Sequence, residues 1–289
     1  MKFADCVRGT TTLTDGAWGT EFQKLVAALG ECSDEWNVNK PELVRQVAES
    51  YVRAGSQVIL TNTFRANSIA LTTYGLQDKF ESINRAGVKL SRAAAGGTAM
   101  VFASIGPSGK LLLTKEVSEE QLRSAFSEQA RALAAEGPDA LLIETMTDLV
   151  EARIAAAAAL ETGLAVIVSM VFDSGKNRDR TMMGVTPEQA AAALTSDGVH
   201  GIGANCGLGI REFIPVCKRL ATSSPLPIWI KPNAGLPEMV GGVAKYKTTA
   251  EEFAASAKEL IAAGATFLGG CCGTSPEFVR ELARVREKQ

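Results

Sequence analysis

The sequence has little that would place the protein in a membrane, on nucleic acid or outside the cell. Its longest strongly apolar run, Leu164 to Phe172, is too short to cross a bilayer. Its first residues lack the apolar core of a secretion signal. The formal net charge of −2 gives no basic excess of the kind that nucleic-acid binders carry. These absences predict a cytoplasmic protein with neither a membrane nor a nucleic acid as its partner.

Histidine is almost absent, and the cysteines are too sparse for a disulfide scaffold. The one histidine, His200, stands at the start of a predicted strand, which favours a packing or surface residue over a metal ligand or a base. Six cysteines in 289 residues do not resemble a secreted disulfide-rich domain. A reducing compartment would leave such thiols available to bind a metal.

The chain does contain a regular alternation of short apolar runs and longer amphipathic segments. Helical segments show apolar residues at 3.6-residue spacing, as at Val44, Val47 and Tyr51, and no linker-like stretch divides the chain. This pattern predicts an α/β fold, a single-domain (β/α)8 TIM barrel over residues 1–289, with an open doubly wound sheet as the alternative. The predicted strands are Thr12–Asp15, Gln57–Thr61, Met100–Ser104, Ala140–Glu144, Ala165–Met170, Gly201–Asn205, Ile228–Lys231 and Thr266–Gly269.

Unusual polar residues follow the predicted strands, where the active site of a β/α barrel forms. They are Asp15, Asn62, Glu144, Asn205, Cys206, Asn233, Cys271 and Cys272. Because these residues come from separate elements that would meet at one end of the barrel, we expect a functional site there.

Three cysteines at these strand ends, Cys206, Cys271 and Cys272, are flanked by glycine. Three thiolates are the ligand set of a zinc ion that keeps one exchangeable position. The sequence offers no matching fourth cysteine or histidine, which a closed structural zinc site would need. A strained disulfide between the two adjacent cysteines is a less favoured alternative. The remaining cysteines are predicted to be buried apolar residues: Cys6, Cys32 and Cys217.

Zinc with three thiolates carries a formal charge of −1 and is therefore a poor activator of water. A thiol that coordinates the ion nevertheless loses its proton. The predicted chemistry is therefore alkylation of a thiol rather than hydrolysis.

Six ordered motifs resemble the homocysteine S-methyltransferase family, whose members are β/α barrels. The motifs are Asp15-Gly16-Ala17-Trp18-Gly19-Thr20, Thr61-Asn62-Thr63-Phe64, Ile143-Glu144-Thr145, Asn205-Cys206-Gly207, Lys231-Pro232-Asn233-Ala234-Gly235 and Gly269-Gly270-Cys271-Cys272-Gly273-Thr274. The resemblance runs from about Asp15 to Arg280. It implies zinc held by the three cysteines, homocysteine bound to zinc through its sulfur, and a methyl transfer that gives methionine.

The resemblance also implies a set of substrate-binding residues: Asp15, Gly16, Gly19, Thr20, Glu144 and Asn233. The two carboxylates would accept hydrogen bonds from the ammonium group, and the backbone near the two glycines would bind the carboxylate. The asparagine would fill or border the open zinc position. Without the resemblance, the Asp-Gly pair would also suit a turn and Glu144 would also suit a helix-capping charge. Asn62 and Asn205 are predicted to hold the loops in place.

The methyl donor is less well specified. The Pro-Asn-Ala-Gly-Leu-Pro and Gly-Gly-Cys-Cys-Gly-Thr segments are most similar to the homocysteine-binding domain of cobalamin-dependent methionine synthase, which implies methylcobalamin. The chain has no cobalamin module, so a corrinoid would arrive on a separate partner protein. The alternatives are S-methylmethionine or betaine as donor, another corrinoid-dependent methyl-transfer system, or a non-catalytic zinc-binding barrel. Trp18 and Trp36 could attract a cationic donor, although we expect them to pack against loops.

Overall fold

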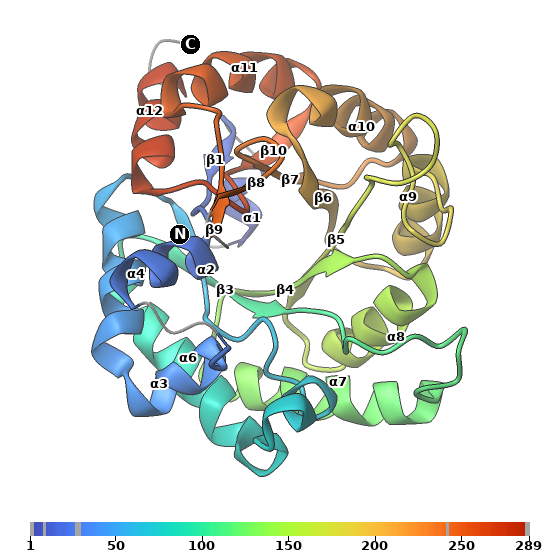
Figure 1. Cartoon of the computed structure of the whole chain (residues 1–289). Coiled ribbons are helices and arrows are strands. Elements are labelled where there is room, and N and C mark those ends of the chain that lie inside the picture. Colours follow the sequence, from blue (N-terminus) through green and yellow to red (C-terminus); the bar gives the residue numbers. More distant parts are fainter. Residues whose placement is uncertain (1–2, 8–9, 27–29, 241–242, 287–289) are drawn as a thin grey trace.

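Eight parallel strands form a barrel that is surrounded by helices (Figure 1). The structure, a computed structural model, describes residues 3–7, 10–26, 30–240 and 243–286. The strand order is β1-β10-β7-β6-β5-β4-β3-β2, and a bridge between Thr14 and Val58 joins the two ends. The predicted TIM barrel is therefore confirmed. The barrel strands are β1 Thr12–Leu13, β2 Val58–Leu60, β3 Met100–Ile105, β4 Ala140–Met146, β5 Ala165–Met170, β6 Gly201–Gly209, β7 Ile228–Asn233 and β10 Ala265–Leu268.

Three of the helices begin with a capping box. Ser118, Thr186 and Thr249 each form a capping box with the residue three positions on. No helix in the described ranges is long and apolar enough to span a bilayer. The α-helices are α1 Phe3–Cys6, α2 Trp18–Leu25, α3 Trp36–Asn39, α4 Pro41–Arg53, α5 Ser68–Leu71, α6 Phe80–Ala95, α7 Glu119–Ala134, α8 Leu149–Leu160, α9 Pro187–Ser196, α10 Ile210–Ser223, α11 Ala250–Ala262 and α12 Pro276–Arg286. Short 3-10 turns lie at η1 Ser33–Glu35, η2 Thr72–Tyr74 and η3 Gln77–Lys79.

Large aromatic side chains fill the barrel interior towards the N-terminal ends of the strands. Phe102, Trp229 and Phe267 are fully buried, and their ring centroids lie 5.4–5.8 Å apart. Phe3 of α1 packs against two of these rings, Phe102 and Phe267. This apolar layer closes the N-terminal end of the barrel. The polar side chains of the barrel interior therefore lie at the C-terminal ends of the strands.

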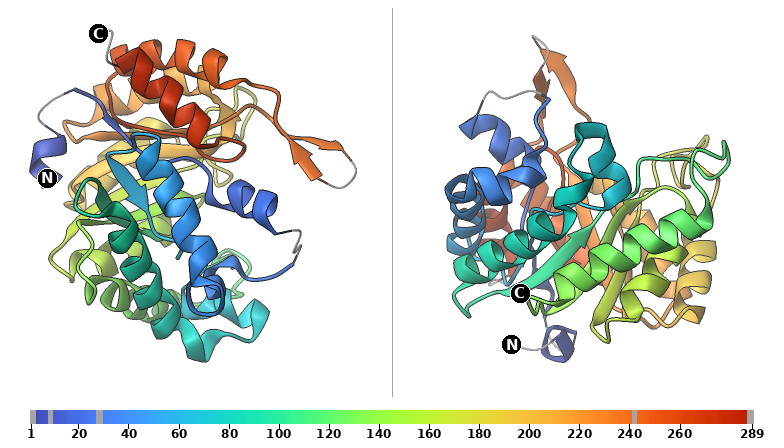
Figure 2. Two further views of the ribbon diagram at one scale, coloured as in Figure 1. Left: turned by 90° about the vertical axis from the view of Figure 1, so that its left-hand side faces the viewer. Right: turned by 90° about the horizontal axis from the view of Figure 1, so that it is seen from below.

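Four strands run further than predicted, and one hairpin was not predicted. β3 continues to Ile105, β4 to Met146, β6 to Gly209 and β7 to Asn233. β4 and β6 each have a break in register close to the C-terminal end. Between β7 and α11 the antiparallel strands β8 Glu238–Val240 and β9 Val243–Lys245 form a hairpin. The hairpin projects away from the barrel (Figure 2).

Candidate active site at the C-terminal ends of the strands

The structure brings together the three cysteines that the sequence singled out. The sulfur atoms of Cys206, Cys271 and Cys272 lie within 4.8 Å of one another, and those of Cys206 and Cys272 are 4.0 Å apart. The turn after β10 is fixed against β7, because Cys271 N donates to Pro232 O at 2.7 Å and Ala234 N donates to Cys272 O at 2.9 Å. Cys271 and Cys272 are both free thiols, so there is no disulfide between the adjacent pair.

The other residues of metal-binding type lie where the sequence analysis expected them. Cys6, Cys32 and Cys217 are buried away from the cluster. His200 is exposed at the N-terminal end of β6, where its Nδ1 accepts a hydrogen bond from Val166 N at 3.2 Å. Histidine therefore takes no part in the sulfur cluster.

Backbone strain is concentrated beside this cluster, and Asn205 stabilises it. Thr145 and Cys206 both have positive φ, 62° and 64°, a conformation that costs about 1–3 kcal/mol in a residue with a side chain. The Asn205 amide accepts from Thr145 N at 2.9 Å and Ser169 Oγ at 2.7 Å. It donates to Thr145 Oγ1 at 2.7 Å and lies 3.9 Å from Cys271 Sγ. Asn205 thus holds the C-terminal ends of β4, β5 and β6 together, whereas a role in holding loops was predicted.

Without a metal, the three thiols compete for negative charge. Hydrogen bonds from Cys271 and Cys272 lower the pKa of Cys206 to about 3. The same contacts with Cys206 raise the pKa of both Cys271 and Cys272. One thiolate is therefore stable in the free cluster, and deprotonating all three sulfurs requires a nearby cation.

The donor set fits zinc on two geometric observations. A tetrahedral ion with zinc–sulfur bonds of about 2.3 Å places its sulfurs about 3.8 Å apart, close to the 4.0 Å found between Cys206 and Cys272. Asn233 Oδ1 is buried with no hydrogen-bond partner among the described residues. The amide of Asn233 also interacts with the Cys206 thiol. An unpartnered buried acceptor next to a sulfur cluster is an additional candidate ligand or substrate contact.

A buried ion pair lies on the inner side of the site. Lys231 Nζ, from β7, is 2.5 Å from Asp15 Oδ1, and both side chains are almost fully buried. Asp15 Oδ2 accepts from Leu60 N at 2.8 Å and Trp18 Nε1 at 2.7 Å. Asp15 therefore joins the ends of β1, β2 and β7 and orients the Trp18 ring. Trp36 is buried against Phe22, as expected of a packing residue.

Glu144 lies near this pair and has more freedom to bind a ligand. Its Oε1 accepts from Ser104 Oγ at 2.5 Å, and hydrogen bonds among the described residues engage only this oxygen. Burial raises the pKa of Glu144, while the positive charge of Lys231 and the Ser104 hydrogen bond oppose that rise. Glu144 can therefore accept a further hydrogen bond from a cationic group.

The predicted Asp-Gly segment is closely packed at its start and open further on. A Cβ on Gly16 would lie 2.8 Å from both Thr274 Oγ1 and the Tyr51 hydroxyl oxygen, so only glycine fits there. Gly19, in the first turn of α2, is exposed, and a Cβ there would meet nothing within 4 Å. Thr20 Oγ1 is buried without a hydrogen-bond partner in the described part of the chain.

Sequence reasoning gave no role to Lys231, Ser104 or Tyr246. The role of Lys231 could have been predicted from the sequence, because a lysine within a buried strand requires a negatively charged partner. No sequence feature indicated a role for Ser104, since its contact with Glu144 joins neighbouring strands that are far apart in the sequence. Tyr246 follows the unpredicted hairpin, and its hydroxyl interacts with the Cys272 sulfur. Burial, followed by the nearby sulfurs, raises the pKa of Tyr246 to about 12, so the phenol keeps its proton.

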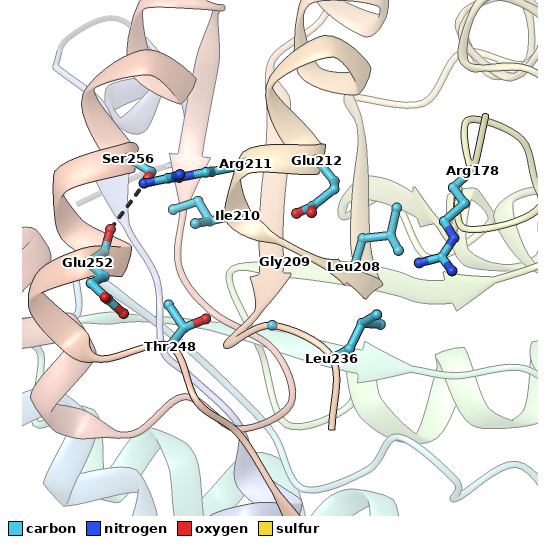
Figure 3. Close-up of a pocket in the computed structure, with 11 residues that line it drawn as sticks. Arg178, Leu208, Gly209, Ile210, Arg211, Glu212, Leu236, Thr248, Glu252 and Ser256 are labelled. Carbon is cyan, nitrogen blue, oxygen red and sulfur yellow. Dashed lines mark hydrogen bonds between the residues drawn. The ribbon is translucent and has the colours of Figure 1, made fainter. Parts of the chain in front are cut away.

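A cavity of about 330 Å³ lies beside the C-terminal end of β6, at Leu208 and Gly209, and beside Leu236, which follows β7 (Figure 3). It lies between the first turns of α10 and α11. Its lining includes both signs of charge, Arg178 and Arg211 with Glu212 and Glu252, and none of the three cysteines. The cavity is therefore next to the sulfur cluster but does not contain it.

Exposed apolar side chains gather at the same end of the barrel. In the described ranges, every large exposed hydrophobic residue lies in a segment that connects the C-terminal end of a barrel strand to the next barrel helix, or in the first turn of that helix. They are Leu25, Val38, Leu111, Leu113, Val150, Met182, Met183, Leu236 and Met239. Exposed apolar side chains concentrated on one face are a feature of interaction surfaces. We call these nine residues the apolar rim.

Comparisons with known proteins agree on one family. Residues 12–286 match the model of the homocysteine S-methyltransferase family. Methionine synthases of Mycobacterium leprae (strain TN) and Mycobacterium tuberculosis (strain ATCC 25618 / H37Rv) are 30% and 29% identical over 286 and 288 residues, each covering 93% of this chain. The chain spans only 24% of the length of either protein.

A solved structure of a homocysteine methyltransferase also matches this chain. The metallated form of the homocysteine methyltransferase MmuM from Escherichia coli matches with a TM-score of 0.81 and 25% identity. The match covers 98% of this chain and 99% of that chain. On the extent of the family match, supported by the shared barrel, the chain belongs to the homocysteine S-methyltransferase family.

Proposed function

We propose that this protein is a zinc-dependent methyltransferase that transfers a methyl group to the thiol of homocysteine and so produces methionine. The observation that carries the proposal is the cluster of three sulfurs within 4.8 Å, located beside buried carboxylates at the C-terminal end of the barrel. Membership of the homocysteine S-methyltransferase family supports it.

Each element of the site has a role in this proposal. Cys206, Cys271 and Cys272 hold zinc, which supplies the positive charge that makes an incoming thiol a thiolate at neutral pH. Glu144 accepts hydrogen bonds from the substrate ammonium. Asp15, which already accepts hydrogen bonds from three donors, keeps Lys231 and Trp18 in place beside it and contributes negative charge to the same ammonium.

The remaining proposed contacts orient the rest of the amino acid. Backbone N–H groups near Gly16 and Gly19, together with the Thr20 hydroxyl, bind the substrate carboxylate. Asn233 borders the position that the substrate sulfur takes. The substrate sulfur then forms a bond to the methyl carbon as the carbon–donor bond breaks, and the electron pair of that bond stays with the donor. The contribution of the protein is alignment of the sulfur with that carbon.

The Glu144 contact can be tested with a substrate that lacks the ammonium group. We expect Glu144→Gln to lower kcat/KM for homocysteine about 10- to 200-fold, because the charged hydrogen bond to the ammonium is lost, at about 1.5–3 kcal/mol. The same change should alter kcat/KM for 4-mercaptobutyrate less than threefold. Equal losses with both thiols would contradict the assignment of Glu144 to the ammonium.

We further propose that the methyl donor is a methyl-corrinoid carried by a separate protein. The similarity to methionine synthases supports this donor, and so does the apolar rim, which provides a surface on which a protein carrier could dock. A small donor such as S-methylmethionine or betaine would require no such surface.

One experiment tests both the reaction and the donor. Zinc-loaded protein is supplied with homocysteine and, in turn, with a methylated corrinoid protein, free methylcobalamin, S-methylmethionine and betaine. We expect the corrinoid protein to be the best donor. We expect the double variant Leu113→Ser/Met239→Ser to raise KM for it at least fivefold, with activity on free methylcobalamin unchanged. Higher turnover with a small cationic donor would replace the corrinoid proposal, and no turnover with any donor would contradict homocysteine methylation.

A further inference from the structure

The segment from the end of β7 to the start of α11 approaches the sulfur cluster twice. Asn233, the last residue of β7, interacts with the Cys206 thiol through its amide. Tyr246, directly after β9, interacts with the Cys272 sulfur through its hydroxyl. Between these residues the chain forms the projecting β8–β9 hairpin (Figure 2). One segment thus places polar groups beside two of the three sulfurs.

The two ends of this segment are held together at its base. A Cβ on Gly235 would lie 2.9 Å from Thr248 Oγ1, so the chain returns to its starting point before α11 begins. Tyr246 lies two residues before this closure, at the base of the hairpin rather than at its tip. Its position therefore depends on the barrel.

The ring of Tyr246 is fixed by a close contact with the turn that carries the adjacent cysteines. Gly273 has φ of +82°, and a Cβ there would lie 2.2 Å from Tyr246 Cγ. Only glycine allows the ring to lie this close to the backbone. The contact places the half-buried phenol directly beside Cys272.

We propose that Tyr246 is a positioning residue of the zinc site, whose hydroxyl donates a hydrogen bond to the Cys272 sulfur when the metal is bound. This inference rests on the proposed zinc site. A donor to a coordinated thiolate stabilises its negative charge and fixes its direction, and loss of such outer contacts weakens metal binding about 10- to 100-fold. The hairpin that carries Tyr246 is also part of the apolar rim through Met239, so a docked partner would lie beside this contact.

The test uses Tyr246→Phe, which keeps the ring on Gly273 and removes only the hydroxyl. We expect zinc affinity, measured by competition with a chromophoric chelator, to fall at least tenfold. In cobalt-substituted protein we expect the sulfur-to-cobalt charge-transfer band to move to lower energy, because an uncompensated thiolate gives up an electron more easily. Tyr74→Phe, which removes the hydroxyl of a tyrosine on another loop, should match the unchanged protein in both measurements.

The possible outcomes separate this inference from the zinc site itself. If the unchanged protein shows cobalt–thiolate bands and Tyr246→Phe has the same affinity and spectrum, the hydrogen bond has no role and the inference is wrong. If Tyr246→Leu loses affinity while Tyr246→Phe does not, ring packing accounts for the effect and the inference is again wrong. Absence of cobalt–thiolate bands in the unchanged protein would instead contradict the zinc site.

Discussion

Replacing Cys206 by alanine is expected to remove zinc and abolish methyl transfer while leaving the barrel folded. Zinc sites built on thiolates bind with about 10–16 kcal/mol, so one of three or four ligands accounts for about 2.5–5 kcal/mol. Its loss weakens zinc binding by at least about 60-fold. Zinc content after dialysis, the chelator-competition affinity and the rate of homocysteine methylation measure the effect.

The barrel should survive this change because Cys206 is only partly buried and lies after the hydrogen-bonded core of the sheet. Alanine also keeps the backbone atoms that pair β6 with β7. Cys217→Ala is the matched control, since Cys217 is fully buried in α10 and far from the cluster. It should retain full zinc content. Equal zinc loss in both variants, or normal activity of Cys206→Ala, would show that the ligand assignment is wrong.

Replacing Lys231 by methionine is expected to be the most destabilising single change at the site. Methionine has a similar length but no charge, so the Asp15 carboxylate would remain buried without its cation. Breaking a buried ion pair in this way costs about 3–5 kcal/mol. The free energy of unfolding in urea, measured by circular dichroism, gives the effect.

Two further variants isolate the cause. Lys24→Met removes an exposed lysine that is also 2.5 Å from its carboxylate partner, Glu21, and should cost less than about 1 kcal/mol. Asp15→Asn combined with Lys231→Met removes both charges and should recover at least half of the lost stability. A cost for Lys231→Met no larger than that for Lys24→Met would contradict the structural role of the pair.

The sequence was sufficient to predict the barrel because each strand and helix has a strong local pattern. The eight apolar runs and the amphipathic segments between them all indicate one repeating unit. The sulfur cluster was predictable for a related reason: parallel strands bring their C-terminal ends to one face, so Cys206 and Cys271-Cys272 had to approach each other.

What could not be predicted depends on long-range contacts or on strained backbone. Lys231 and Asp15 are 216 positions apart, and no local pattern pairs them. The positive φ of Thr145 and Cys206 opposes the intrinsic preference of both residues, and the Asn205 side chain hydrogen-bonds Thr145 in this conformation. The strands of the β8–β9 hairpin have three residues each, too few for a periodic signal, and this loop carries Tyr246.

The most direct test of the account is zinc K-edge X-ray absorption of the purified, zinc-loaded protein, before and after homocysteine is added. We predict three zinc–sulfur contacts with one lighter ligand in the free protein, and a fourth sulfur in place of that lighter ligand once homocysteine is present. Two or fewer sulfurs in the free protein, or a ligand set that homocysteine leaves unchanged, would contradict the account.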